Sequence, residues 1–432
     1  MILKASIILI VVFATLLAVG IPIAISVATA SILTVLLVLP IDIAVFTSAQ
    51  KLVTSIDSFS LVAVPFFMLS GVIMNHGGIA EKLINLAKLF GGRIPGSLAH
   101  TNIIGNSLFG SISSSAIAAS TAIGGVMVPS QIKQGYDRKF AAAVNIASAP
   151  TGMLIPPSTA FIIYSLISGG TSISALFMSG LVIGLLWAIA IMVVSYFIAK
   201  QRNYPTVTKD HSVKPLKIII DAIPSLLLVI IIIGGILSGV FTAIESSAIA
   251  VVYSLFLALV YYKTLKIKDL PKVFIQTIEL TGVIMFLIAT SALMTFTMAL
   301  TGMPTALSNL VLSISDNPII ILLVINIILL LVGTVMDIGP AILIFTPIFL
   351  PIATEIGMDP IHFGAFFILN LSIGTITPPV GTGLFVGASI ANVKIEQVIK
   401  PLLPFYIAII VVLALVTYIP SISLFLPNLL DL

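Results

Sequence analysis

Long apolar stretches dominate this chain from its first residues to its last. No ionisable residue occurs between Lys4 and Asp42, whereas a membrane-spanning helix needs only about 20 apolar residues. Similar stretches recur to the C-terminus, separated by short polar connections. The pattern predicts an all-α multi-pass membrane protein, with residues 1–432 forming a single membrane domain of about ten or eleven spanning helices.

The first apolar stretch contains Ala28-Thr29-Ala30, a tripeptide typical of a signal-peptide cleavage site. The stretch continues to Leu39, whereas the apolar region of a signal peptide is about 7–15 residues long. We therefore expect a retained first helix, bent near Pro22, rather than a removed leader.

Composition agrees with a membrane location and narrows the possible functions. Hydrophobic residues make up 59% of the chain and charged residues 8%, and the mean hydropathy is +1.27. A soluble domain carries about a quarter charged residues, so this surface must face membrane lipids. The formal net charge of +4 comes from short connections and does not indicate a nucleic-acid partner. Cysteine is absent, which excludes disulfides, thiol catalysis and cysteine metal sites.

Basic residues mark one side of the membrane. They gather at residues 88–93, 133–139, 200–217 and 263–272, which the positive-inside rule places in the cytoplasm. Between Lys272 and Lys394 there is no lysine or arginine, and the connections carry acidic residues instead. Residues 201–272 are predicted to form a cytoplasmic loop and a linking helical pair with its turn near Gly239.

Glycines and prolines recur at one nearly constant offset, between 222 and 224 residues. The pairs at this offset are Gly78 and Gly302, Gly110 and Gly333, Gly135 and Gly357, Phe140 and Phe363, and the doublets Pro156-Pro157 and Pro378-Pro379. Apolar composition alone does not produce such pairs, because glycine and proline act on the backbone. With the opposite charge of their connections, the pairs predict inverted-topology repeats over residues 57–200 and 280–426, as in many secondary transporters.

Each repeat contains an apolar stretch interrupted by small polar residues. In residues 101–135, serines and glycines gather in the middle and basic residues lie near both ends. This arrangement predicts a re-entrant helical hairpin with its tip at residues 110–115. Residues 318–357 predict a second hairpin with its break at residues 333–337. The alternative is an ordinary helix pair with a serine-rich packing face.

A helix broken by a double proline follows each hairpin, over residues 139–169 and 360–391. Two successive prolines remove two amide donors and free the carbonyl groups about one turn earlier. The resulting unwound stretch presents carbonyl and hydroxyl oxygens, which suit an alkali cation. A purely structural kink is the alternative.

Acidic residues inside apolar stretches are few, and they usually mark function. Asp337 lies at the second hairpin tip and is expected near substrate or ion. Glu245 follows the turn near Gly239 and is interpreted as a helix-capping carboxylate. The membrane segments of the second repeat contain no basic residue. An anion there would be met by helix N-termini and bound cations, which predicts tight coupling to sodium.

Amphipathic segments precede both hairpins. Ile79, Leu83, Leu86 and Phe90 form a helix-spaced apolar stripe, and Met303, Leu307, Leu310 and Ile314 form its counterpart in the second repeat. Residues 78–92 and 302–315 are therefore predicted to be arms between a mobile transport core and a peripheral scaffold.

At these residues the chain closely resembles the large membrane subunit of tripartite ATP-independent periplasmic (TRAP) transporters. Matching stretches are VPFFMLSG (Val64–Gly71), GSISSSAIAASTAIG (Gly110–Gly124), GVFTAIESSAIAVVY (Gly239–Tyr253) and FTPIFLPIATEIGMDPIHFGAFFILNLSIGTITPPVG (Phe345–Gly381). The resemblance implies an elevator-type sodium symporter, not an enzyme, in a bacterial or archaeal inner membrane. Its partners would be a soluble periplasmic binding protein and a small membrane subunit, which we expect to be a separate chain.

The resemblance implies a small organic anion as substrate, such as sialic acid or a C4-dicarboxylate, and Na⁺ as the coupling ion. It places the first sodium site at Gly110, Ser113, Gly152, Ile155 and Pro157, and the second at Gly333, Gly374, Thr377 and Val380. Ser114, Ser158 and Asp337 are expected to face the substrate.

Three other functions remain as alternatives at this point. A sodium/dicarboxylate-type carrier without a binding protein would share the ion sites. An ion channel would need a continuous polar path, which the two opposed hairpins disfavour. An intramembrane enzyme would need a catalytic pair, and Asp337 has no evident intramembrane partner.

Overall fold

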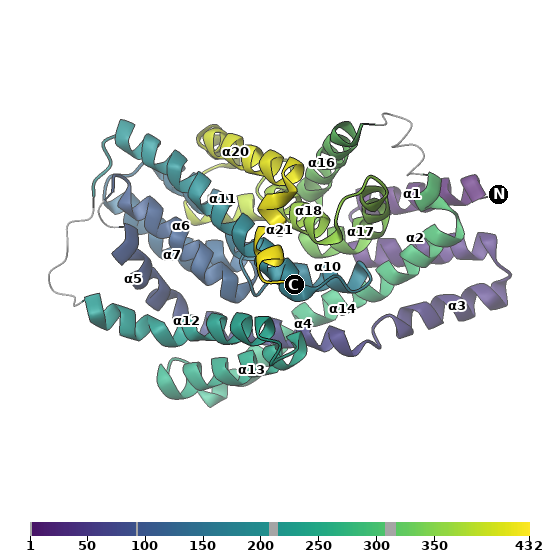
Figure 1. Cartoon of the computed structure of the whole chain (residues 1–432), viewed down its shortest axis with the longest axis horizontal. Helices are drawn as coiled ribbons and strands as arrows, with labels where there is room; N and C mark the ends of the chain where they lie inside the picture. Colours follow the sequence, from purple (N-terminus) through teal and green to yellow (C-terminus); the bar gives the residue numbers. More distant parts are fainter. Residues whose placement is uncertain (1, 92–93, 207–214, 307–316) are drawn as a thin grey trace.

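A computed structural model describes residues 2–91, 94–206, 215–306 and 317–432 of the chain. These residues form helices and short connections without any β-strand (Figure 1). The predicted all-α class is thereby confirmed. Within the described ranges, seven helices are long and apolar enough to cross a membrane, or nine if each of two bent pairs is one span. Ten or eleven were expected, and the difference arises because three further apolar helices have fewer than 18 residues.

The N-terminal helices are α1 (Ile2–Ala18), α2 (Ile23–Val38) and α3 (Ile41–Thr54), followed by the 3₁₀ turn η1 (Phe59–Val62) and α4 (Ala63–His76). The expectation of one helix bent near Pro22 is wrong, because α1 and α2 are separate helices that pack on each other. The chain reverses at Gly20, whose φ of +86° is a left-handed conformation that glycine adopts without strain. Pro22 then fixes the start of α2.

Helix α5 (Ile79–Gly91) is the first predicted arm and is inclined by 75° to α4. The bend lies at Gly77 and Gly78, and Gly78 has a φ of +66°. Ile79, Leu83 and Leu86 are buried as the apolar stripe predicts, whereas Phe90 is exposed. The counterpart arm over residues 302–315 lies largely outside the described residues.

The first repeat contains a hairpin of α6 (Ser97–Ser113) and α7 (Ala116–Lys133). Its broken helix consists of α8 (Arg138–Ser148), α9 (Thr151–Leu154) and α10 (Thr159–Ile167), and α11 (Ile173–Gln201) follows. The predicted tip residues end α6, and the Pro156-Pro157 doublet separates α9 from α10. Helix geometry stops there because two successive residues without amide hydrogens cannot donate to the preceding turn.

The second repeat has the same order of elements. Its helices are α16 (Pro318–Val335) and α17 (Ile338–Glu355) for the hairpin, α18 (Pro360–Gly374) and α19 (Thr382–Ile390) for the broken helix, then α20 (Ile395–Tyr418) and α21 (Pro420–Leu429). The repeats interlock, since α7 packs on α19 while α17 packs on α10. In Figure 1 the α6–α7 hairpin lies toward the left of the molecule and the α16–α17 hairpin toward the right.

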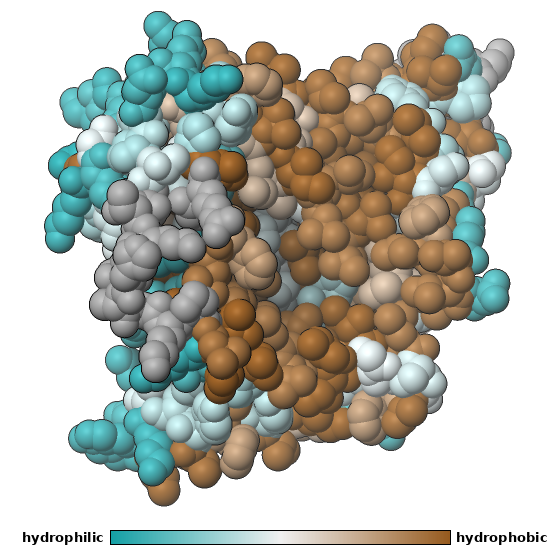
Figure 2. Space-filling view, turned by 60° about the vertical axis from the view of Figure 1, so that its left-hand side comes forward, coloured by the Kyte–Doolittle hydropathy of each residue, from teal (hydrophilic) through white to brown (hydrophobic). Residues whose placement is uncertain are grey.

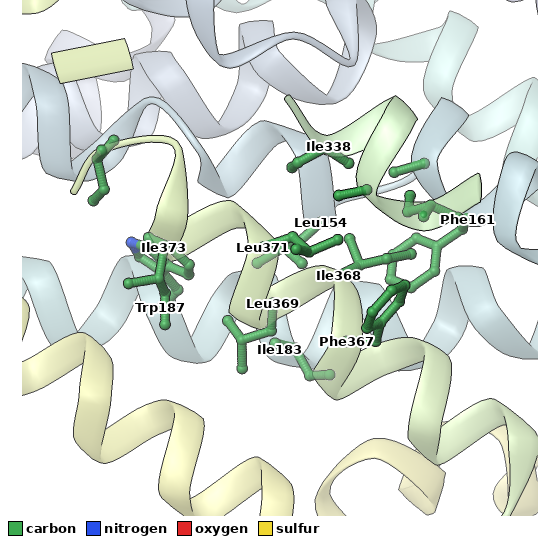
Figure 3. Packing of buried hydrophobic residues seen from close by; sticks show 14 of the residues in the cluster. Leu154, Phe161, Ile183, Trp187, Ile338, Phe367, Ile368, Leu369, Leu371 and Ile373 are labelled. Carbon is green, nitrogen blue, oxygen red and sulfur yellow. The ribbon is translucent and has the colours of Figure 1, made fainter. Parts of the chain in front are cut away.

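Helix α11 and the broken helices contribute many of the buried side chains in the largest apolar cluster. Phe161, Trp187 and Phe367 are among the large side chains that are fully buried (Figure 3). The indole nitrogen of Trp187 donates to the carbonyl oxygen of Ala147 at 2.9 Å, which fixes α11 against α8. We call α6–α11 and α16–α20 the core bundle.

Several of the other helices form a second bundle, of which α12 and α13 lie along the lower edge of Figure 1. It comprises α12 (Pro215–Leu237), α13 (Ala243–Leu255), the π-helical turn η2 (Phe256–Tyr261), the 3₁₀ turn η3 (Ile267–Asp269) and α14 (Leu270–Leu300). Helix α4 packs against α13 and α14, and α2 and α3 pack against α14. We call this group the scaffold bundle.

The predicted capping role of Glu245 is confirmed. The Thr242 hydroxyl oxygen accepts from the backbone amide of Glu245 at 3.2 Å, and the Glu245 carboxylate accepts from the backbone amide of Thr242 at 2.8 Å. This reciprocal capping box defines the start of α13 and satisfies two amides that have no partner within the helix.

Removing the Thr242 cap should lower stability without affecting the core bundle. We expect Thr242→Ala to destabilise the protein by about 0.5–2 kcal/mol, seen as a lower melting temperature of the purified protein in detergent. The control is Thr54→Ala, because the exposed Thr54 hydroxyl donates only within its own helix, to the Gln50 carbonyl. Equal melting temperatures for the two variants would contradict the capping role.

Candidate functional site

Each hairpin crosses its broken helix at a pair of glycines. A side chain on Gly110 would place its Cβ 2.5 Å from the Cα of Gly152, and one on Gly152 would clash with the backbone of Gly110. In the second repeat, Gly333 and Gly374 meet in the same way. The structure therefore brings together the predicted site glycines of each repeat, with their backbones in contact.

An asparagine pair lies close to each glycine crossing. Asn106 donates to the side-chain oxygen of Asn145 at 3.1 Å, and Asn370 donates to that of Asn326 at 2.7 Å. The pairs join α6 to α8 and α16 to α18. Asn106 lies four residues before Gly110, whereas Asn326 lies seven before Gly333. Because of this shift of about one helical turn, the two asparagines do not fall at the offset shared by the glycines and prolines of the repeats.

The first hairpin tip is bonded directly to the first break. Ser114 has a left-handed backbone with a φ of +50°, and its hydroxyl donates to the carbonyl oxygen of Pro157 at 2.6 Å. The Ser113 hydroxyl oxygen is buried and has no hydrogen-bond partner among the described residues. Four of the five residues predicted for the first sodium site, Gly110, Ser113, Gly152 and Pro157, thus belong to one contact between tip and break. Ile155 is buried and leads into the break.

The second tip and break are joined through backbone atoms. The amide of Gly381 donates to the carbonyl oxygen of Thr334 at 3.1 Å. The Thr377 hydroxyl donates to the Ile373 carbonyl at 2.7 Å, and the Tyr406 hydroxyl donates to the Ile376 carbonyl. Val380 lies within the break and is 41% exposed. All four predicted residues of the second sodium site therefore lie at one hairpin–helix crossing.

A cavity of about 530 Å³ lies between the core and scaffold bundles. The core side is formed by both hairpin tips and both breaks, and the scaffold side by α4, α14 and the start of α2. Figure 2 shows a hollow in the apolar surface with more hydrophilic residues in its floor. Among the described lining residues, Asp337 is the only ionisable one.

Four helix N-termini line this cavity. They belong to α7, α10, α17 and α19, and their first residues Ala116, Thr159, Ile338 and Thr382 all contribute to the wall. Each N-terminus carries a partial positive charge from amides without helical partners. The cavity therefore provides a favourable potential for an anion without any basic side chain.

Two of the three residues expected to face substrate line the cavity. Ser114 and Asp337 are in its wall, and Asp337 precedes the first residue of α17. Ser158 does not line it, because its side chain is buried and its hydroxyl donates to the Met153 carbonyl at 2.5 Å. That hydrogen bond satisfies a carbonyl freed by the Pro156-Pro157 break.

The scaffold side of the cavity was not foreseen from the sequence. Asn75 and Gln276 are its only polar residues among those described. Both are polar residues in mainly apolar segments near a cluster of basic residues. This combination is the sequence signal that could have identified them as lining residues.

Comparison with known proteins identifies the family to which this arrangement belongs. Residues 10–422 match the sequence profile of the DctM component of tripartite ATP-independent periplasmic transporters. The chain belongs to this TRAP transporter family. The resemblance stated from the sequence is thus confirmed over nearly the whole chain.

Two named TRAP permeases illustrate the relationship. The sialic acid TRAP transporter large permease protein SiaM of Vibrio cholerae is 40% identical over 88% of this chain and 89% of its own length. The C4-dicarboxylate TRAP transporter large permease protein DctM of Pseudomonas aeruginosa is 38% identical over the same shares of the two chains. The uncharacterized protein YgiK of Salmonella typhimurium is 49% identical over 96% of both.

The fold also matches a solved membrane transporter. The YdaH transporter of Alcanivorax borkumensis superimposes with a TM-score of 0.65 over 88% of this chain and 89% of its own, at 14% identity. TRAP membership implies a tripartite system with a small membrane subunit and a periplasmic binding protein. It therefore favours transport with a binding protein over the stand-alone carrier.

The glycine crossing of the first repeat should not tolerate a methyl group. We expect Gly152→Ala to destabilise the protein by about 1–3 kcal/mol, because α9 must move away from α6. The control is Gly125→Ala in α7, where a Cβ meets no atom within 4 Å and alanine favours the helix by about 0.5–1 kcal/mol. Thermal unfolding in detergent measures both variants. A melting temperature for Gly152→Ala at or above that of the unmodified chain would contradict the close crossing.

Proposed function

We propose that this chain is the sodium-coupled carrier of a tripartite uptake system and moves a small organic anion into the cell by an elevator motion. One observation carries the proposal: the cavity lies between the core bundle, with its two opposed hairpin tips, and the scaffold bundle. A substrate there sits at the boundary of two packed bodies. A rigid shift of the core bundle against the scaffold would carry the substrate across the membrane.

The chemistry of both crossings fits sodium. Backbone carbonyls and hydroxyls are hard oxygen ligands, which suit a hard cation. A buried hydroxyl without a partner is costly, and that of Ser113 accordingly fits a cation ligand at the first crossing. Gly333, Gly374, Thr377 and Val380 would hold the second ion. Bound Na⁺ would supply positive charge next to the substrate cavity.

An organic acid is the substrate class that the cavity supports. The four helix N-termini favour negative charge, and no lysine or arginine is among the described lining residues. Because helix ends supply only partial charges, we infer that affinity for the anion depends on sodium bound beside it. Sialic acid and C4-dicarboxylates, which appear in the names of relatives, are the first candidates.

We infer that the conformation described here is inward-facing. The cavity extends from the hairpin tips to Asn75, near the end of α4, and to Gln276, near the start of α14. Lys272 precedes Gln276 by four residues, and Lys82 and Lys88 lie on α5, directly after α4. By the positive-inside rule, these lysines lie on the cytoplasmic side of the inner membrane that would hold the carrier.

Reconstitution tests the proposed coupling. We expect liposomes that contain this chain and its small membrane subunit to accumulate N-acetylneuraminate or succinate only with an inward sodium gradient and the cognate binding protein. Omitting the binding protein, or replacing sodium by potassium, should abolish uptake. Uptake without the binding protein would support the stand-alone carrier, and uptake in potassium would contradict sodium coupling.

Ser113 and Ser111 form a matched pair for the first ion site. The Ser111 hydroxyl already donates to Leu108 within its own helix, so Ser111→Ala should leave the sodium dependence unchanged. Ser113→Ala should raise the sodium concentration for half-maximal uptake on the order of tenfold, as loss of one ligand to a charged group predicts. The same sodium dependence in both variants would remove Ser113 from the site.

Cross-linking tests the elevator motion. A Cβ at Gly71 of α4 would lie 3.6 Å from the carbonyl oxygen of Ile112 in α6, and the chain has no cysteine of its own. Cross-linking of the double variant Gly71→Cys, Ile112→Cys with a short bifunctional methanethiosulfonate should therefore stop uptake, and reduction should restore it. Each single-cysteine variant serves as the control. Unchanged uptake in fully cross-linked protein would contradict the motion.

A further inference from the structure

The scaffold wall of the cavity carries two amides in otherwise apolar surroundings. Met68, Val72, Leu280, Val283 and Leu287 make up most of this wall. Asn75 on α4 and Gln276 on α14 are its only polar residues among those described. An amide side chain in an apolar wall that faces a cavity is favourable when a polar ligand meets it.

His76 orients the Gln276 amide. The Nε2 atom of His76 lies 2.9 Å from the Oε1 atom of Gln276. A carbonyl oxygen only accepts hydrogen bonds, so the histidine donates in this contact. The contact with His76 uses only the oxygen of the Gln276 amide, and the amide nitrogen makes no hydrogen bond within the described part of the chain. Gln276 is thus fixed with two donor hydrogens available.

Asn75 adds a second available amide. Asn75 is exposed and lines the cavity, and its side chain makes no hydrogen bond to the described residues. Asn75 directly precedes His76, the residue that fixes Gln276, so the two amides lie close to each other. Donors from two scaffold helices therefore meet at the same end of the cavity.

The donors suit a carboxylate better than any other ligand of the proposed carrier. Asp337 on the core side is acceptor-only when ionised and would repel a carboxylate close to it. Neutral amide donors bind a carboxylate without the strength of an arginine pair. An anion that lies in the cavity therefore finds donors for its carboxylate on the scaffold side, away from Asp337.

We propose that Gln276 and Asn75 form a carboxylate-binding subsite that the substrate contacts only in the inward-facing state, with His76 as the positioning residue. The inference rests on the proposed function, because the scaffold stays in place while the core bundle carries the substrate outward. These amides lie at the cytoplasmic end of α4 and α14 and are left behind in that motion. The subsite thereby sets the affinity for substrate on the cytoplasmic side alone.

Trans-inhibition separates the two sides of the membrane. Internal N-acetylneuraminate or succinate, whichever the unmodified chain takes up, should inhibit its uptake. In Gln276→Leu we expect the half-inhibitory internal concentration to rise about fivefold, as loss of one neutral hydrogen bond predicts, while the external KM is unchanged. Gln50→Leu, at an exposed position of α3 that does not line the cavity, should behave as the unmodified chain. A parallel change on both sides, or none, would overturn the proposal.

The role of His76 has its own readout. His76→Gln retains a donor and should keep the internal half-inhibitory concentration of the unmodified chain, whereas His76→Phe should reproduce Gln276→Leu. Equal effects of the two histidine variants would overturn the positioning role.

A thiol probe tests the place of the subsite without any substrate. Because the chain lacks cysteine, Gln276→Cys carries a single thiol. We expect membrane-impermeant methanethiosulfonate ethylsulfonate to label it in inside-out vesicles and not in right-side-out vesicles. Labelling from the outside would overturn the subsite. Absent uptake together with labelling from the inside would instead count against the proposed transport function and leave the position of the subsite standing.

Discussion

Close contact between two interrupted helices is the constraint on which the rest of this structure depends. Backbone that leaves helical geometry inside a membrane must find partners in the protein, because lipid offers none. The hairpin tips and the proline breaks meet that requirement by packing on each other. Gly110 against Gly152 and Gly333 against Gly374 allow backbone-to-backbone contact. Larger residues would separate the segments and leave carbonyl groups facing hydrocarbon.

Electrostatics follow from the same interruptions. Every break creates a new helix N-terminus, and four of them are directed to one cavity. The partial charges are fixed to the backbone, so they need no ionisable side chain and no counter-ion in the apolar interior. Hydroxyls and carbonyls at the breaks supply oxygen ligands close by. A single device, the interrupted helix, thus provides both an anion-favouring cavity and candidate cation sites.

Local backbone signals explain how much of this was predictable from the sequence. The serine-rich tip and the two proline doublets indicated the hairpins and the broken helices, because glycine and proline alter the backbone conformation at their own positions. Contacts between distant helices were not predictable in this way. Ser158 carries the right chemistry, yet its hydroxyl is taken by Met153. The asparagine pairs differ by one turn between repeats, and the scaffold wall depends on how α4 and α14 meet.

The reversal between α1 and α2 shows the same limit. Pro22 indicated an interruption of the helix, but a bend and a full reversal have the same local sequence signature. Only the packing of α1 on α2 distinguishes them. Sequence therefore located the change of direction correctly and left its angle undetermined.

The sharp turn from α4 into α5 has a consequence for the lipid environment. An amphipathic helix inclined by 75° to the helix before it fits the boundary between headgroups and acyl chains. This boundary moves outward when the hydrocarbon layer thickens, and a membrane helix as short as the 14 residues of α4 adapts by local thinning of the bilayer or by snorkelling of its flanking residues. In the proposed elevator motion, the distance that the core bundle travels would therefore depend on the thickness of the bilayer. The acyl-chain length of the lipids would then affect transport as directly as a change in the protein.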